Sequence, residues 1–96
     1  MFIISTSFKK PIEEVERFLP GHIAYLDKYH ACGMYIFSGR KNPRTGGCIL
    51  AKAPNRESVL NAIKEDPFYQ EGIADYEITE FLPTKYVNAF RPIAEE

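Results

Sequence analysis

The sequence has no excess of positive charge and no long apolar run. Its 96 residues hold 12 Lys and Arg against 13 Asp and Glu, which gives a formal net charge of −1. A chain without a basic field has little to hold a nucleic-acid backbone, and no apolar stretch approaches the roughly 20 residues that cross a bilayer. We therefore expect neither nucleic acid nor a membrane among its partners.

Cysteine is also scarce, and the first residues lack the pattern of a secretory signal. Cys32 and Cys48 could form at most one bridge, whereas small secreted domains usually carry several. Residues 2–6 have no basic start, no apolar run and no small-residue cleavage site. These features predict free thiols and a cytoplasmic protein.

The sequence does contain enough apolar surface for one modest core. Apolar residues are 45% of the chain and aromatic residues 14%, which favours a folded domain over disorder. A chain of this length forms a single domain. We place that domain at residues 1–90, with residues 91–96 as a C-terminal tail. Residues 83–96 are expected to be irregular, although Tyr86, Val87 and Phe90 are apolar enough to dock on something.

Hydrophobic periodicity predicts four strands and two helices. Their order is strand, helix, two strands joined by a turn, helix and strand, which is the split β-α-β arrangement. We therefore expect an α+β, ferredoxin-like fold in which two helices cover one face of a four-stranded antiparallel sheet. The other face also carries apolar groups, which predicts a homodimer with the two sheets packed face to face. The predicted strands span residues 2–8, 34–40, 47–53 and 75–82, and the predicted helices span residues 11–31 and 55–66.

The first predicted helix carries a candidate for chemistry. At about 100° per residue its apolar positions share one face, and His22 lies inside the same arc, so the imidazole should point inward. Pro20 removes a backbone hydrogen bond and predicts a kink just before His22. Gly39, inside the second strand, suggests a bulge or the close approach of another group. The apolar positions of the helix face are Ile12, Val15, Leu19, Leu26 and Tyr29.

The stretch Asp66-Pro67-Phe68 combines a carboxylate, a helix-stopping proline and an aromatic ring. A residue before proline is pushed out of the helical region, so Asp66 should end the second helix. Asp66 is then suited to cap a short helical turn that Pro67 begins and Gly72 ends. It is equally a fixed carboxylate whose candidate partner is His22. The two roles are compatible because a carboxylate has two oxygens.

Short motifs follow one another along the chain: Pro20-Gly21-His22 with Tyr25-Leu26, Ser38-Gly39, Gly46-Gly47, and Asp66-Pro67-Phe68 with Gly72. In this order, over roughly residues 1–90, the sequence resembles the YciI-like (YCII-related) family of small dimeric α+β barrel proteins. The resemblance implies a ferredoxin-like dimer whose pocket holds a His-Asp pair that has been proposed as catalytic. One relative is similar to a dehydrochlorinase of chlorinated hydroxyaromatics, and muconolactone isomerases share the fold.

On this resemblance His22 and Asp66 are the catalytic pair, with His22 as the base and Asp66 as the group that orients it. The sequence departs from the family pattern at two positions. Many members have arginine where this chain has Leu19, and many have proline where it has Arg40. Arg40 and Arg44 are the nearest substitutes for the missing charge. The candidate substrate-binding residues are Ser38, Gly39, Arg44, Phe68 and Tyr25.

We expect a small-molecule enzyme, a lyase, isomerase or dehydrochlorinase-like protein that performs acid–base chemistry on a cyclic or hydroxyaromatic substrate. Two alternatives stay open: a non-catalytic dimeric module that binds a small ligand, and a haem or quinol monooxygenase-like protein on the same fold. An inward histidine is by itself more often a hydrogen-bonded core residue than a base. No cofactor is expected, and no metal, because His30-x-Cys32 lacks paired zinc-ligand spacing. Ser38 lacks the Gly-x-Ser-x-Gly context of a hydrolase nucleophile.

Overall fold

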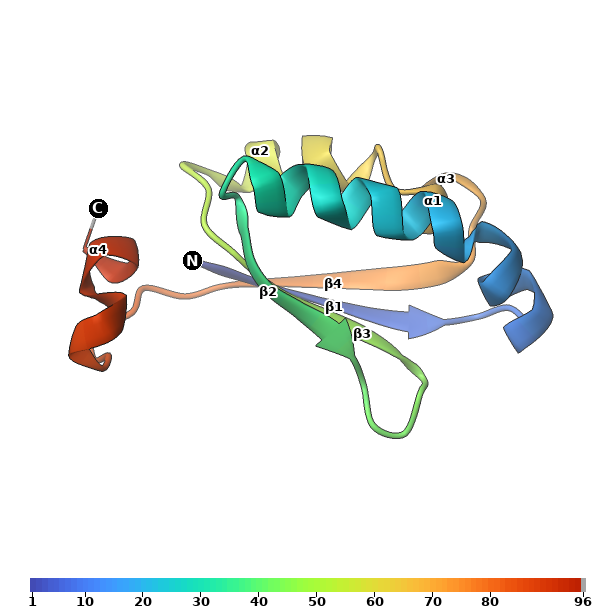
Figure 1. Ribbon diagram of the computed structural model, residues 1–96, viewed down its shortest axis with the longest axis horizontal. Coiled ribbons are helices and arrows are strands. Elements are labelled where there is room, and N and C mark those ends of the chain that lie inside the picture. The colour runs from blue at the N-terminus through green and yellow to red at the C-terminus, as the bar shows by residue number, and fades with distance from the viewer. Residues whose placement is uncertain (96) are drawn as a thin grey trace.

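The computed structural model describes residues 1–95 and shows a sheet with helices on one of its faces (Figure 1). The elements are β1 (Phe2–Phe8), α1 (Ile12–Ala31), β2 (Tyr35–Arg40), β3 (Gly46–Ala51), α2 (Arg56–Ile63), α3 (Pro67–Gln70), β4 (Ala74–Glu80), η1 (Asn88–Phe90) and α4 (Arg91–Ala94). The four strands are antiparallel and pair in the order β2-β3-β1-β4. Helices α1, α2 and α3 lie on one side of the sheet, and η1 and α4 lie beyond one end of it. The expected α+β, ferredoxin-like fold is confirmed.

Local chemistry sets the ends of the helices. Asn55 caps α2, because its Oδ1 accepts a hydrogen bond from the Ser58 N–H at 2.9 Å. Gly33 follows α1 with a φ of +84°, which glycine adopts readily. Helix α2 ends at Ile63 and not at residue 66 as predicted. At Asp66 the backbone hydrogen bond spans three residues and not the four of an α-helix. It runs from the Asp66 N–H to the Ile63 carbonyl oxygen, at 2.9 Å.

The tail is more regular than the sequence predicted. Residues 83–95 were expected to be irregular, but they include the short helices η1 and α4. Of the tail residues expected to dock, Phe90 has its ring edge-on to Phe37 with 6.0 Å between the ring centroids, whereas Val87 is 63% exposed. Lys52 Nζ donates a hydrogen bond to the Ile93 carbonyl oxygen at 2.5 Å. Glu96, the last residue of the predicted tail, lies outside the described residues.

Side-chain alternation along β1 separates the two faces of the sheet. Phe2, Ile4 and Thr6 are buried beneath the helices, whereas Ile3 on the opposite face is 41% exposed. The pattern matches the expectation of one face packed against helices and one face left open. Because β1 is a central strand, its register fixes which residues of β3 and β4 point toward the helices.

A bulge in β2 changes which of its side chains face the helices. The register shifts between Tyr35 and Phe37, so Ile36 is an extra residue relative to β3. Ser38 and Arg40 then oppose β3 residues whose partners on β1 are buried under the helices. The bulge therefore directs two polar side chains toward the helix layer.

Two groups of buried side chains fill the space between sheet and helices. The larger packs α2 and the C-terminal half of α1 on the sheet, and the smaller contains Val15 and Phe68. The predicted apolar face of α1 is confirmed at Val15 and Tyr29, but Ile12 is 41% exposed. Tyr25, one turn before Tyr29, is buried as well. Ile12 stays exposed because it begins the helix, and the first turns of α1 (blue in Figure 1) are set at an angle to the rest.

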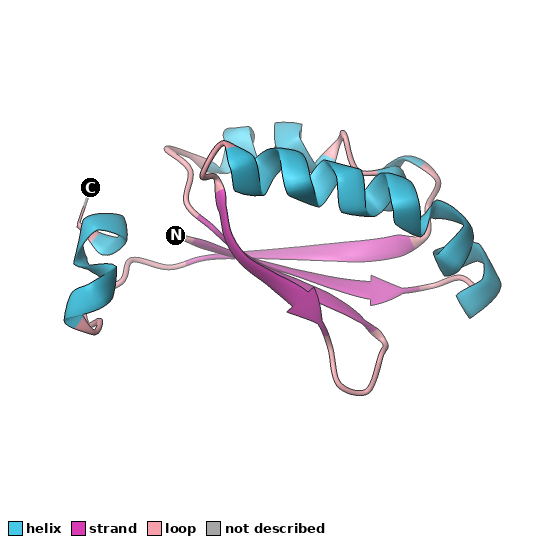
Figure 2. Cartoon of the chain, in the orientation of Figure 1, coloured by secondary structure: helices cyan, strands magenta, loops and turns pink. Residues whose placement is uncertain are grey.

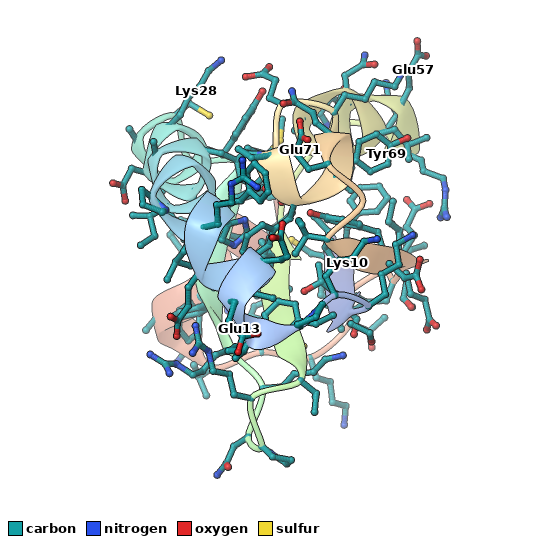
Figure 3. All side chains as sticks on the ribbon, turned by 90° about the vertical axis from the view of Figure 1, so that its right-hand side faces the viewer. Lys10, Glu13, Lys28, Glu57, Tyr69 and Glu71 are labelled. Atoms are coloured by element: carbon teal, nitrogen blue, oxygen red, sulfur yellow. The ribbon has the colours of Figure 1, made fainter. Side chains whose placement is uncertain are left out.

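Apart from the contact of Phe90 in η1 with Phe37, the sheet face opposite the helices carries no helix of the described chain (Figure 2). Ile3, Phe37 and Phe81 are apolar side chains that remain exposed. On the outer side of the helix layer the exposed side chains include the charged Lys28 and Glu57 and the aromatic Tyr69, which Figure 3 labels. Residues 1–95 include no helix whose length and hydropathy would let it span a membrane.

Candidate functional site

A cavity of about 280 Å³ lies between α1 and the strands β1, β2 and β3, with α3 contributing one ring. It brings together five residues that the sequence singled out, namely His22, Ser38, Gly39, Arg44 and Phe68. Much of the remaining wall is apolar. The apolar lining residues besides Phe68 are Phe8, Leu19, Ile23, Leu26 and Ile49.

Glycines in β2 and β3 line this cavity. Gly47 lies on the helix-facing side of β3, and a Cβ there would lie 3.0 Å from the carbonyl oxygen of Gly39. A Cβ on Gly46 would lie 1.9 Å from the carbonyl oxygen of Thr6, so another residue would have to displace the backbone. Gly39 pairs regularly with Cys48 and has open space around its Cα. The bulge predicted at Gly39 is therefore wrong, and the extra residue lies earlier in β2.

The imidazole of His22 forms part of the cavity wall and stacks on Phe68. The two ring centroids are 4.0 Å apart and the ring planes differ by 6°. The His22 side chain is 15% exposed. Close packing of α1 on α3 supports the stack, because a Cβ on Gly21 would lie only 2.9 Å from Pro67 Cγ. The ring of His22 is thus held in one orientation.

Asp66 lies behind His22 and is completely buried. Its Oδ1 is 2.8 Å from Nδ1 of His22 and accepts a second hydrogen bond from the Phe68 N–H at 2.9 Å. Its Oδ2 accepts a hydrogen bond from the hydroxyl of Tyr76. These three donors replace the water that a carboxylate loses on burial. Asp66 therefore caps α3 and contacts His22 at the same time.

The carboxylate selects one tautomer of the neutral imidazole. Because an ionised carboxylate can only accept hydrogen bonds, Nδ1 of His22 donates to Asp66 and Nε2 is left unprotonated. Tyr76 remains a donor to Asp66, since burial, then the nearby Asp66 charge and hydrogen bond, raise the pKa of Tyr76 well above its ordinary value. An imidazole oriented in this way can accept a proton from a ligand in the cavity.

Tyr25 does not line the cavity, although it was a candidate substrate-binding residue. Its hydroxyl forms a hydrogen bond with that of Tyr35, while the Tyr29 hydroxyl donates to Glu65 at 2.6 Å. The three rings pack with centroids 5.2 to 5.7 Å apart. Burial raises the pKa of Tyr25 well above its ordinary value and that of Tyr29 and Tyr35 to about 12. We call these three residues the tyrosine cluster.

The permanent positive charge at the cavity comes from the hairpin that joins β2 to β3. Arg40 and Arg44 both line the cavity. Nη1 of Arg44 lies 3.6 Å from Oε1 of Glu16 on α1. Leu19 on α1 contributes an apolar side chain to the cavity.

The residues considered as metal ligands do not gather at one place. Nε2 of His30 lies 2.8 Å from Oγ of Ser38, and Sγ of Cys32 lies 3.5 Å from the carbonyl oxygen of Tyr29. Cys48 lines the cavity as a free thiol. Across residues 1–95, no three His, Cys, Asp or Glu side chains form a group that could hold a metal ion.

Comparison with known proteins identifies the family. A family model described as the YCII-related domain matches residues 1–82. The chain belongs to the YCII-related family. Among solved structures, this YCII-related chain is similar to 5-chloro-2-hydroxyhydroquinone dehydrochlorinase (TftG) from Burkholderia phenoliruptrix AC1100, in a complex with 2,5-dihydroxybenzoquinone. The two share 17% sequence identity and a TM-score of 0.70, over 84% of this chain and 93% of TftG, which supports the same fold. No curated protein matches the sequence significantly.

Two contributors to the site of this YCII-related domain were not predicted from its sequence. Tyr76 is the donor to the second oxygen of Asp66, and Thr6 Oγ1 accepts a hydrogen bond from the Gly47 N–H at 2.9 Å. The alternation of Tyr76 with Ile78 marks both as residues on one face of β4, which is a usable signal. The contact of Tyr76 with Asp66 depends on how β4 and α3 pack, and no local pattern indicates it.

Proposed function

We propose that this YCII-related domain is a small-molecule enzyme that moves a proton on a cyclic or hydroxyaromatic substrate, as a lyase, isomerase or dehydrochlorinase does. His22 acts as the base and Asp66 orients it. The observation that carries the proposal is the 2.8 Å contact from Nδ1 of His22 to a buried carboxylate, made by a ring that also lines a cavity. A histidine placed between a carboxylate and a ligand-sized space is arranged for general acid–base catalysis.

The cavity walls support a ring as the substrate. Flat and apolar side chains such as Phe68 favour contact with a planar molecule. Nε2 of His22 takes a proton from the substrate, and Asp66 stabilises the imidazolium that forms. Return of the proton to another atom of the substrate gives isomerisation, and departure of a leaving group such as chloride gives elimination. The likeness to TftG, whose name describes a dehydrochlorinase of a hydroxyhydroquinone, supports this substrate class.

We also propose that the chain forms a homodimer through the open face of its sheet. Ile3 and Phe37 are exposed on this face, by 41% and 57% of their surface, and apolar surface of this kind favours an interface. A second copy packed against it would bury these side chains. Sedimentation equilibrium at micromolar concentration should give about 22 kDa, twice the chain mass of 11.0 kDa. A single species with the mass of one chain would overturn the dimer.

The substitution His22→Gln tests the catalytic role. It keeps the volume and a hydrogen-bonding group beside Asp66 but removes the titratable nitrogen. The free energy of unfolding should stay within about 1 kcal/mol of wild type. Turnover of chlorinated hydroxyhydroquinones, related hydroxyquinones or lactones should be lost. Lys10→Gln, a change at an exposed residue labelled in Figure 3, is the control and should keep full activity.

The same variant separates an enzyme from a binding module. Turnover at the wild-type rate in His22→Gln would exclude His22 as the base. Ligands that bind to wild type and to His22→Gln, with no turnover by either, would favour the non-catalytic module. The side-chain nitrogen signals of His22 in an NMR spectrum give a readout without a known substrate, since the neutral ring should carry its proton on Nδ1.

A further inference from the structure

The cavity is permanently charged at one end only. Among the described residues that line it, Arg40 and Arg44 carry such a charge, and no carboxylate lines it. Arg40 is the last residue of β2, and Arg44 lies in the loop that leads to β3. His22 and Phe68 come from α1 and α3, on another wall. The cavity thus has a cationic end on the hairpin and a stacked imidazole elsewhere.

The two guanidinium groups have no strong partner within the described residues. Nη1 of Arg44 is 3.6 Å from Oε1 of Glu16, which is longer than a hydrogen bond, and the Glu16 side chain is 61% exposed. An exposed pair of this kind contributes little to stability, so Arg44 can exchange Glu16 for a ligand. The guanidinium of Arg40 makes no hydrogen bond or ion pair with residues 1–95. Its cross-strand neighbour Gly47 has no side chain and also lines the cavity.

We infer that the hairpin end of the cavity is an anion subsite, and that the substrate is a planar ring bearing a carboxylate or an ionised acidic hydroxyl. A guanidinium donates paired hydrogen bonds to such a group, and does so better than a single ammonium. The inference rests on the proposed function, because it names the substrate class of the same cavity. It adds that the substrate is negatively charged and that Arg40 and Arg44 recognise this charge.

A cationic end also fits the chemistry proposed for His22. When Nε2 removes a proton from a hydroxylated ring, the electron pair that is left behind moves onto the ring oxygens as negative charge. Fixed positive groups near that charge stabilise it more strongly in a cavity than in water. Arg40 and Arg44 would therefore act on the ligand before the proton transfer and during it.

Calorimetric binding of two matched ligands tests the subsite. The ligands are 2,5-dihydroxybenzoate and 2,5-dihydroxybenzamide, which differ in charge but hardly in shape. Wild type should bind the acid about tenfold more tightly than the amide, the scale of one charge-assisted contact. Arg40→Gln and Arg44→Gln should each weaken binding of the acid severalfold and leave binding of the amide unchanged. The double variant should lose the preference, and added salt should reduce it in wild type.

Two further variants sharpen the test. Glu16→Gln removes the competing carboxylate and should tighten binding of the acid. Arg17→Gln removes a positive charge from an exposed arginine of α1 that does not line the cavity. It should change the binding of neither ligand. Thermal melting of each variant should match wild type, because all four positions are at least partly exposed.

Several results would overturn the subsite. They are equal binding of acid and amide to wild type, no binding of either at millimolar concentration, and equal weakening of both ligands in the arginine variants. The measurement does not require turnover, so it fails independently of the proposed function. If His22→Gln stays active, the function fails while a preference for the acid stands. If the preference is missing and His22→Gln is inactive, the subsite fails and the function stands.

Discussion

Two polar groups lie one helical turn apart on α1 and differ in what surrounds them. At Tyr25 the hydroxyl meets Tyr35, and the side chain is 5% exposed. At His22 the imidazole meets Asp66 on one side and the cavity on the other. The two rings are neighbours, with centroids 5.9 Å apart. The Tyr25 hydroxyl is paired within the protein, whereas the His22 imidazole also faces the cavity.

The strands opposite α1 account for this difference. Beneath Tyr25, the ring of Tyr35 fills the space between helix and sheet. Near His22, Gly47 occupies the corresponding layer of β3 and lines the cavity. The comparison teaches that, in this chain, a large strand residue accompanies the buried tyrosine and a glycine accompanies the histidine at the cavity. Four experiments test the contrast between the buried Tyr25 and the His22 imidazole at the cavity.

The largest expected effect is a loss of stability at alkaline pH, which arises from the tyrosine cluster. Burial raises the pKa of Tyr29 and Tyr35 from 10.0 to about 12, and that of Tyr25 further. Above about pH 10 the unfolded chain therefore loses protons that the folded chain keeps, and stability falls by on the order of 1 kcal/mol per pH unit for each tyrosine. Urea unfolding at rising pH, followed by tyrosinate absorbance, should show ionisation together with unfolding. Ionised cluster tyrosines in a chain that stays folded would contradict this prediction.

Asp66→Ala should give the largest loss among single substitutions. It leaves three donors without a partner, from His22, Phe68 and Tyr76. The free energy of unfolding should fall by about 3 kcal/mol or more, the combined scale of a lost cap and buried unsatisfied groups. Chemical denaturation measures the loss. Asp66→Asn, which keeps an acceptor, should lose less, and equal losses for both variants would count against this account.

Tyr25→Phe should have a smaller effect, on stability alone. It removes one hydroxyl and leaves that of Tyr35 unpaired in a buried place, which costs about 1–2 kcal/mol. Ligand binding should not change, because Tyr25 does not line the cavity. The effect is therefore the reverse of that expected for His22→Gln. The control Tyr69→Phe, at a side chain that is 48% exposed, should change stability by less than about 0.5 kcal/mol.

Glu65 at the edge of the tyrosine cluster should give the smallest effect. Hydrogen bonds from Lys28, at 2.5 Å, and then from Tyr29 lower the pKa of the Glu65 carboxyl from 4.5. The stability that Glu65 contributes is therefore complete above its ordinary pKa and is lost as the pH falls through the lowered value. Between about pH 5 and about pH 3, the melting temperature should fall more for wild type than for Glu65→Gln. Parallel curves for the two proteins would rule out this contribution.

The fold was largely predictable because it follows from local signals. The order of strands and helices is visible in apolar periodicity, and Asn55 and Gly33 act at helix ends as their chemistry requires. The contact between His22 and Asp66 was also within reach. A helix period placed the imidazole inward, and the proline after Asp66 fixed where the carboxylate had to lie.

The rest of the site depends on contacts between elements that no local pattern specifies. The burial of Tyr25 follows from the ring of Tyr35 opposite it, and the position of Tyr76 follows from the packing of β4 under α3. The facing of Arg40 toward the cavity follows from the bulge at Ile36, whereas the sequence suggested a bulge or the close approach of another group at Gly39. Register and packing decide these features.

The bulge at Ile36 makes strand register a determinant of what the cavity can hold. If Ile36 paired regularly with Leu50 in place of bulging, every later side chain of β2 would exchange faces, because strand side chains alternate. The phenyl ring of Phe37 would then enter the cavity, and Ser38 and Arg40 would move to the open face of the sheet. A regular pairing would thus replace a hydrogen-bonding, cationic lining with an apolar one in an unchanged sequence, whereas deletion of Ile36 would leave Phe37 opposite Leu50 and Arg40 opposite Gly47. In this strand, the pairing of each residue matters as much as its identity.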